Sequence, residues 1–139
     1  MSSSKQKNEY KHLNTVVCMI NYHFVFCPRY RRKIFLIPKV EDRFKQLVKQ
    51  KCKELNIEIV AIECDKDHCH IFLNCMPTQS PSDIMHHIKG YTSRIMRKEF
   101  EVLNKMPSLW TRSFFVSTAG NVSSETIKKY IENQKTRYN

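Results

Sequence analysis

The sequence has little glycine and little proline, with 2 Gly and 5 Pro among 139 residues, whereas 41% of its residues are hydrophobic. This composition excludes collagen-like and disordered chains and indicates a globular protein. Long hydrophobic runs are also missing, because the longest, Val16 to Ile20, is far shorter than the about 20 residues of a transmembrane helix. The N-terminal segment is polar and lacks the apolar core of a secretory signal, so we expect a cytoplasmic protein with no membrane partner.

Paired cysteine spacings are absent as well, since no two cysteines form a C-x-x-C motif. Most of the cysteines lie within or at the end of predicted strands, and a buried cysteine behaves as a small hydrophobic residue. We therefore expect reduced thiols packed in the core rather than disulfides. The cysteines are Cys18, Cys27, Cys52, Cys64, Cys69 and Cys75.

Acidic side chains are outnumbered, because 24 Lys and Arg residues face 13 Asp and Glu residues and give a formal net charge of +11. The cations gather at 29–33, 89–98 and 128–139, where aromatic residues are interleaved with them. This pattern suits the phosphates and bases of a nucleic acid better than a membrane surface. A basic surface that only keeps the protein soluble is the alternative.

Hydrophobic periodicity predicts a single domain over 15–139, after a polar lead at 1–14. The element order β-α-β-β-α-β-α is the split β-α-β pattern of an α+β, ferredoxin-like or RRM-like fold, with a mainly antiparallel sheet and an appended C-terminal helix. The predicted strands are 15–26, 57–64, 68–76 and 113–118, and the predicted helices are 38–55, 80–100 and about 124–136.

His68 and His70 lie two positions apart on a predicted strand, so both imidazoles face one side of the sheet. Cys69 faces the other side beneath the helices, and it therefore completes no zinc set with the histidines. Two imidazoles on one face are able to coordinate a metal ion. The alternative is that they are simply two surface histidines, which have the same spacing. His23, in the first strand, is interpreted as a hydrogen-bonded sheet histidine rather than a ligand.

Tyr130 and Gln134 are four residues apart, so they are neighbours on one side of the last helix. Periodicity alone favours a core aromatic at position 130. Against that interpretation, a purely apolar core stripe does not explain the presence of Gln134 or of the cations around it. Both interpretations stay open at this level.

Four segments carry a family resemblance: YHFVFCPRYRRKIF, DKDHCHIFL, IKGYTSRIMRKEF and LWTRSFFVSTAGNVSSETIKKYIENQ. In order and spacing, over about residues 15–136, they resemble the HUH single-tyrosine transposases of small insertion sequences, the IS200-like transposases. HUH denotes histidine, a bulky hydrophobic residue and histidine, and here it reads His68-Cys69-His70. The family's YIENQ segment stands intact at Tyr130 to Gln134.

The resemblance implies metal-dependent cleavage and rejoining of single-stranded DNA at insertion-sequence ends. Tyr130 would attack the scissile phosphate, form a 5′-phosphotyrosine and release a 3′-hydroxyl, while His68, His70 and Gln134 would hold Mg²⁺ or Mn²⁺. A phenol with a pKa of about 10 is a poor nucleophile at neutral pH, and a cation on the phosphate neutralises the developing charge. Because the phosphotyrosine link conserves the phosphodiester energy, no nucleotide cofactor is expected.

The resemblance also implies partners, namely single-stranded DNA with subterminal hairpins and a second copy of the chain. In such a homodimer the tyrosine helix of one subunit is able to complete the histidine site of the other, and Gly120 before that helix would permit the exchange. The sequence leaves open whether the site is built in cis or in trans.

Basic and aromatic residues after the first strand and on the second long helix are the candidate DNA contacts. His86 and His87 are interpreted as solvated or capping residues. Two other functions stay open: a catalytically silent RRM-like single-strand binder, and a domesticated relative acting on chromosomal palindromes. The candidate contacts are Arg29, Tyr30, Arg31, Arg32, Lys33, Lys89, Arg94 and Arg97.

Overall fold

The computed structural model describes residues 19–118 and 129–134. Within them lies a four-stranded sheet of order β2-β3-β1-β4, in which every neighbouring pair of strands is antiparallel. This order places β1 and β3 in the centre and confirms the predicted α+β fold with split β-α-β connections. The strands are β1 (Ile20–Phe26), β2 (Glu58–Asp65), β3 (His68–Cys75) and β4 (Phe115–Thr118).

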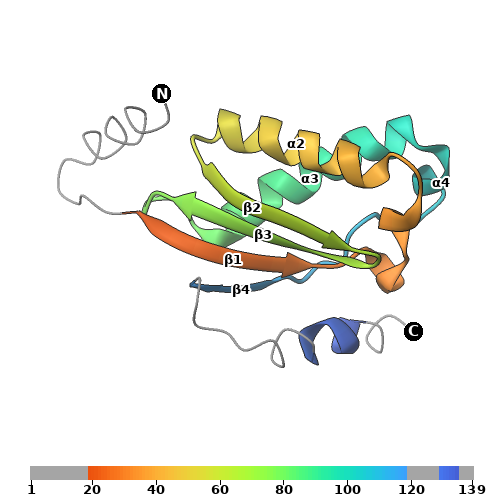
Figure 1. The fold of residues 1–139 in the computed structure, drawn as a ribbon. Helices are drawn as coiled ribbons and strands as arrows, with labels where there is room; N and C mark the ends of the chain where they lie inside the picture. The colour runs from red at the N-terminus through yellow and green to blue at the C-terminus, as the bar shows by residue number, and fades with distance from the viewer. Residues whose placement is uncertain (1–18, 119–128, 135–139) are drawn as a thin grey trace.

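Two long helices, α2 (Val40–Glu54) and α3 (Pro81–Glu99), cover one face of the sheet, and the helical segment 129–134 lies on the opposite side (Figure 1). The start of α3 is as the sequence predicts, because Ser80 accepts a hydrogen bond from the Asp83 backbone N–H at 3.1 Å. None of the helices described here has the length and apolar character needed to cross a membrane.

Short turns not predicted from the sequence flank these elements: η1 (Arg29–Arg31), η2 (Ile34–Leu36) and α4 (Glu101–Asn104). The fourth strand is shorter than expected and begins at Phe115. Its predicted first residue, Ser113, lies outside the strand, and its carbonyl oxygen accepts a hydrogen bond from Lys89 Nζ.

Parts of several predictions lie outside the described residues. These parts are strand residues 15–18 with Cys18, Gly120, and the two ends of the C-terminal helix predicted at about 124–136. Within the described residues, 129–134 are helical, in agreement with that prediction.

The alternation of β3 divides its residues between the two faces of the sheet. Cys69, Ile71 and Leu73 are fully buried beneath the helices, whereas His68 and His70 lie on the other face and are partly exposed. We call this second face the open face. The described cysteines are free thiols, and all but Cys64 are buried, as expected for core residues.

Trp110 closes the core where the chain returns from α4 towards β4. Its ring packs edge-on to Phe26 with centroids 5.0 Å apart, and it also contacts Phe44 at 5.4 Å. The indole Nε1–H donates to Thr92 Oγ1 at 3.0 Å, and that hydroxyl in turn donates to the Ile88 carbonyl at 2.8 Å. Thr92 is fully buried, so this hydrogen bond is shielded from water. It anchors the loop that leads to Ser113.

We expect Thr92→Val to lower the free energy of unfolding by about 1–3 kcal/mol, because it preserves the side-chain shape but leaves the buried indole N–H without an acceptor. Urea denaturation followed by the fluorescence of the single tryptophan measures the change. Thr92→Ser is the matched control, since it keeps the hydroxyl and loses only a methyl group. Wild-type stability in Thr92→Val would contradict the anchoring role of the hydroxyl.

Candidate active site on the open face of the sheet

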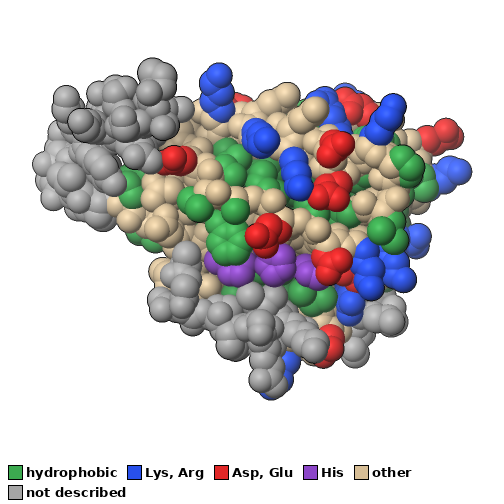
Figure 2. Space-filling model, viewed as in Figure 1, with side chains coloured by type: hydrophobic (Ala, Val, Ile, Leu, Met, Phe, Trp, Pro, Cys, Tyr) green, Lys and Arg blue, Asp and Glu red, His purple; other side chains and the backbone are tan. Residues whose placement is uncertain are grey.

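The open face brings together histidines from two central strands. His68 and His70 come from β3, and His23 comes from β1 beside it. Figure 2 shows histidine side chains adjoining one another in a band across this face, with acidic side chains next to them and Lys and Arg gathered at one end. The predicted pairing of His68 and His70 on one face is therefore observed, with ring centroids 5.1 Å apart.

His68 is held by a buried carboxylate. Its Nδ1 lies 2.9 Å from Asp67 Oδ1, and Asp67 is only 4% exposed. The other carboxylate oxygen accepts two hydrogen bonds from Arg31, from Nε at 3.0 Å and Nη2 at 2.8 Å. Burial alone raises the pKa of Asp67. The hydrogen bonds from His68 and Arg31 and the Arg31 charge together outweigh this effect, so the pKa of Asp67 falls below its ordinary value. The ionised carboxylate thus orients the imidazole.

The backbone bends sharply to bring Arg31 to this carboxylate. Tyr30 and Arg31 have φ angles of 62° and 53°, in the left-handed region that residues with a Cβ rarely adopt. Such strain costs on the order of 1–3 kcal/mol per residue and persists where surrounding contacts hold it. The ion pair between Arg31 and Asp67 is one such contact. The predicted DNA contact Arg31 therefore has a visible partner within the protein.

His70 is held by the histidine of the neighbouring strand. His23 Nε2 lies 3.0 Å from His70 Nδ1, and the His23 ring stacks on Phe72 with centroids 4.2 Å apart. His23 is thus a hydrogen-bonded sheet histidine, as the sequence suggested, but its partner is a candidate metal ligand. Burial is the main cause that lowers the pKa of both His23 and His70, which favours their neutral forms.

The donor set fits a divalent cation in part. Nδ1 of His68 is hydrogen-bonded to Asp67, and Nδ1 of His70 is hydrogen-bonded to His23. Nε2 is therefore the nitrogen of each ring that would bind a metal ion. Across 19–118 and 129–134, no group of three or more His, Cys, Asp and Glu side chains is placed to hold a metal ion. Further ligands would have to come from an amide such as Gln134, from water or from a bound substrate.

Tyr130 and Gln134 meet at one hydroxyl group, that of Ser113. Ser113 Oγ donates to Gln134 Oε1 at 2.9 Å and lies 3.3 Å from Tyr130 Oη. Gln134 is only 3% exposed, and its Nε2 donates to the Tyr130 carbonyl at 3.4 Å. The two predicted functional residues are therefore adjacent. The hydrogen bonds described for their side chains run to Ser113, to Thr111 and to the Tyr130 carbonyl rather than to His68 and His70.

The tyrosine helix nevertheless packs on the same face as the histidines. Ile131 forms a buried cluster with Val25 of β1 and with Cys27, and Tyr130 packs against this cluster. The Tyr130 ring centroid lies 6.0 Å from that of Phe115 on β4. Val25 is in turn the cross-strand partner of His70. Burial raises the pKa of Tyr130 to about 12, although its hydrogen bonds with Ser113 and Thr111 act in the opposite direction. Its hydroxyl is therefore neutral at neutral pH.

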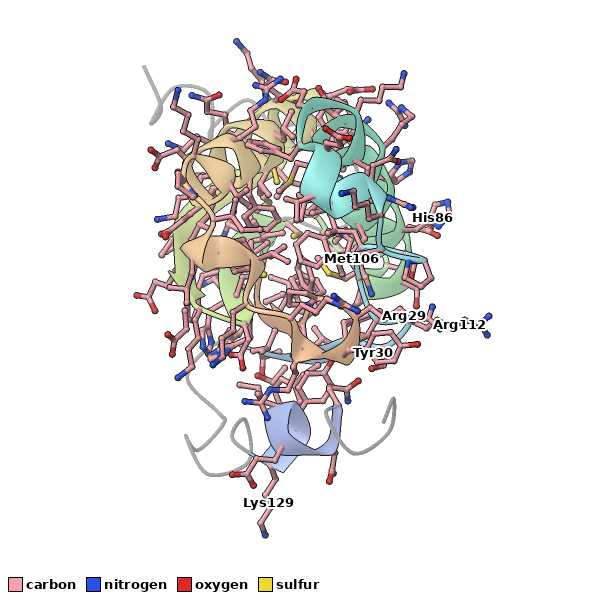
Figure 3. All side chains as sticks on the ribbon, turned by 90° about the vertical axis from the view of Figure 1, so that its right-hand side faces the viewer. Arg29, Tyr30, His86, Met106, Arg112 and Lys129 are labelled. Atoms are coloured by element: carbon pink, nitrogen blue, oxygen red, sulfur yellow. The ribbon has the colours of Figure 1, made fainter. Side chains whose placement is uncertain are left out.

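The predicted DNA contacts divide into two groups. Arg32, Lys33 and Arg94 are exposed to solvent, whereas Arg97 donates to the Met106 carbonyl at 2.6 Å and Arg29 to Ser108 Oγ at 2.9 Å. Figure 3 shows Arg112 and His86 pointing outwards on one side, and Lys129 pointing away from the sheet.

The guanidinium carbons of Arg29 and Arg32 lie over the Tyr30 ring, 5.3 and 5.8 Å from its centroid. His86 and His87 are exposed, in agreement with their interpretation as solvated residues.

Lys89 is a partly buried cation. Its Nζ donates to the carbonyl oxygens of Thr111 and Ser113 at 2.6 and 3.1 Å, and it lies over the rings of Phe26 and Phe114. Burial lowers its pKa from 10.5 to about 8. The lysine predicted to contact DNA therefore supports the loop that carries Ser113 beneath Tyr130.

We expect Lys89 to contribute a positive slope to the pH dependence of the free energy of unfolding between about 8 and 10.5. Thiols whose pKa burial raises from 9.0 to about 12 contribute the opposite slope in this interval, namely Cys27, Cys52, Cys64 and Cys75. In this interval the unfolded chain keeps the Lys89 proton while the folded chain releases it, and stability rises wherever the unfolded state binds more protons. Denaturant titrations at several pH values measure the slope. Lys89→Met should make the slope more negative, and Lys98→Met, at an exposed position of the same helix, is the control expected to leave it unchanged. An unchanged slope in Lys89→Met would contradict the assignment.

Sequence reasoning missed Asp67 and Ser113 as parts of the site. Asp67 lies between the predicted strands 57–64 and 68–76, and a carboxylate directly before the first histidine is a usable signal. The contact of Ser113 with Tyr130 depends on how the last helix packs on the sheet, which no local pattern encodes.

Comparisons with known proteins identify the class. The family model described as "Transposase IS200 like" matches residues 16–134. The IS200 transposase of Salmonella typhimurium is 32% identical over 116 residues, covering 81% of this chain and 75% of the relative. The ISDra2 transposase TnpA of Deinococcus radiodurans is 28% identical over 121 residues, covering 85% of this chain and 86% of the relative.

Solved structures agree with this assignment. A crystal structure of a candidate transposase from Deinococcus radiodurans R1 has a TM-score of 0.80 and 30% identity, covering 87% of this chain and 95% of that one. A REP-associated tyrosine transposase bound to a REP hairpin shares the fold, with a TM-score of 0.57 and 16% identity, over 82% of this chain and 61% of that one. The chain belongs to the IS200-like transposase family.

Proposed function

We propose that this transposase cleaves and rejoins single-stranded DNA through a covalent link between Tyr130 and a 5′-phosphate. The observation that carries the proposal is the packing of the Tyr130 helix on the sheet face that also presents His68 and His70. A nucleophile and two candidate metal ligands on one face are the groups that such a reaction needs. Family membership supports DNA transposition as the setting.

In the proposed reaction, the Tyr130 oxygen forms a bond to phosphorus and the bond to the 3′-oxygen breaks. The phenol proton leaves as the attack proceeds, and the released 3′-oxygen takes up a proton. Because the pKa of Tyr130 is raised to about 12, the free protein holds a neutral phenol that needs activation. Rejoining reverses these steps with a 3′-hydroxyl as nucleophile, so no nucleotide cofactor is consumed.

His68, His70 and Gln134 are the residues that we propose to hold a divalent cation, Mg²⁺ or Mn²⁺. When bound, the cation would neutralise charge on the scissile phosphate and orient it. The two imidazoles favour Mn²⁺ of these two metals, because Mg²⁺ strongly prefers oxygen ligands. Gln134 Oε1 accepts a hydrogen bond from Ser113 Oγ, and the second lone pair of this amide oxygen is the one that would bind the metal.

Single-stranded DNA with a hairpin is the proposed substrate. The net charge of +11 and the exposed cations Arg32, Lys33 and Arg94 supply phosphate contacts, and Tyr30 offers a ring for base stacking. A protein of the same fold is bound to a REP hairpin in its solved structure, which supports a hairpin as the recognised form. A silent RRM-like binder is less favoured, because it gives no role to Tyr130 or to the paired histidines.

We also propose that the active unit is a homodimer in which the tyrosine helix of one subunit completes the site of the other. Within one chain, the hydrogen bonds described for the Tyr130 and Gln134 side chains run to Ser113, to Thr111 and to the Tyr130 carbonyl. An exchange between subunits would bring these residues to a histidine pair. Closed two-fold dimers are the commonest form of soluble homo-oligomer.

Tyr130→Phe should abolish the covalent protein–DNA adduct and leave hairpin affinity within about a few-fold, because only the nucleophilic hydroxyl is lost. The measurement is incubation with Mn²⁺ and radiolabelled single-stranded hairpin DNA from insertion-sequence ends, followed by a denaturing gel. The same sequence as a perfect duplex is the matched substrate control and should give no adduct. Adduct formation by Tyr130→Phe would refute the assignment of the nucleophile.

Mixing inactive Tyr130→Phe and inactive His68→Ala proteins tests the dimer. If sites are completed between subunits, each mixed dimer holds one intact site, and random exchange should restore about one quarter of the wild-type cleavage. Sites built within one chain would give no recovery after proven subunit exchange. An active monomer across the working concentration range would overturn the dimer proposal altogether.

A further inference from the structure

His23 contacts a proposed metal ligand through a defined pair of atoms. Its Nε2 lies 3.0 Å from His70 Nδ1, and the two rings are stacked at an interplanar angle of 25°. His23 is 7% exposed, so water competes little for this hydrogen bond. A neutral imidazole has one N–H donor and one acceptor nitrogen, and the contact therefore needs opposite roles for the two atoms.

The two possible proton arrangements differ in what they leave on His70. If His23 Nε2–H donates, a neutral His70 carries its proton on Nε2 and has no lone pair there for a metal. If His70 Nδ1–H donates, His23 Nε2 accepts, and the Nε2 lone pair of His70 is free. Only the second arrangement matches His68, whose Nδ1 faces the Asp67 carboxylate, a pure acceptor when ionised.

We propose that His23 is a positioning residue that accepts the His70 Nδ1–H and thereby fixes His70 with Nε2 free to bind the metal ion. This inference rests on the proposed metal site and adds a residue and a proton position to it. His23 itself then carries its proton on Nδ1. In this arrangement His23 and Asp67 perform the same task for the two ligands, one with an imidazole and the other with a carboxylate.

The packing around His23 favours a fixed orientation. Its ring lies 4.2 Å from the ring of Phe72, its direct cross-strand partner, at an interplanar angle of 14°. His70 is the diagonal neighbour on the same face, two residues before Phe72 on β3. One ring of β1 is thus stacked on Phe72 and hydrogen-bonded to His70, so rotation of His23 would break both contacts.

The first test reads the proton positions directly in the metal-free wild-type protein. Long-range ¹H–¹⁵N correlation spectra of histidine-labelled protein distinguish the two neutral tautomers, and His70→Ala and His23→Phe assign the signals. We expect the Nδ1–H tautomer for both His70 and His23. An Nε2–H tautomer of His70 would overturn the proposal without any reference to DNA cleavage.

The second test separates the hydrogen bond from the stacking. His23→Phe keeps an aromatic ring against Phe72 but removes the acceptor, whereas His23→Gln offers an amide oxygen near the position of Nε2. We expect Mn²⁺ affinity, measured by calorimetry, to fall about 10- to 100-fold in His23→Phe, the range typical for the loss of a group that orients a metal ligand. His23→Gln should recover a substantial part of that loss.

Separate control experiments test whether the variants fold and whether the metal site exists. Circular dichroism and thermal denaturation establish that each variant is folded, and His70→Ala should abolish Mn²⁺ binding. Absence of Mn²⁺ binding in the wild type, or unchanged binding in His70→Ala, would refute the proposed metal site itself. If His23→Phe binds Mn²⁺ as tightly as the wild type while His70→Ala does not bind it, only the role of His23 is refuted.

Discussion

The pairing of β1 with β3 is the contact on which the rest of the site depends. Its register sets Val25 opposite His70 and His23 opposite Phe72. On one side of this pair, the alternate residues Phe24, Ile71 and their neighbours form the core beneath α2 and α3. On the other side, the same register gathers the histidines and offers Val25 as the floor for the tyrosine helix. The hydrophobic core and the candidate site therefore lie on opposite faces of the same pair of strands.

Around this ladder, the chain uses other residues to hold each functional side chain. Arg31 and Asp67 support His68, His23 supports His70, and Lys89 supports the loop of Ser113. Several of these groups are charged or polar and largely buried, which costs solvation free energy unless each is paired. The structure pairs them with one another or with backbone carbonyls. A small domain thereby holds the side chains of the candidate site in fixed orientations on the open face of its sheet.

Local sequence patterns were sufficient for the strands, the long helices and the face of β3. The period-two alternation around His68 and His70 and the Ser80-Pro81 helix start are signals within a few residues of one another. The pairing of His23 with His70 spans 47 residues, and it depends on strand register. Equally, Ser113 meets Tyr130 only because the last helix folds back over the sheet. Contacts set by register and docking leave no periodic trace in the sequence.

The tight turn at Lys66 and Asp67 has a consequence for how this site tolerates changes in chain length. Asp65 and His68 are paired across it, and Asp67 is at once a turn residue and the partner of His68. A single inserted residue within β3 would exchange the two faces of the strand from that point on, sending a histidine into the core and a core side chain outwards. Insertions and deletions are therefore tolerated least in the hairpin, where one residue of slippage dismantles both the core and the site.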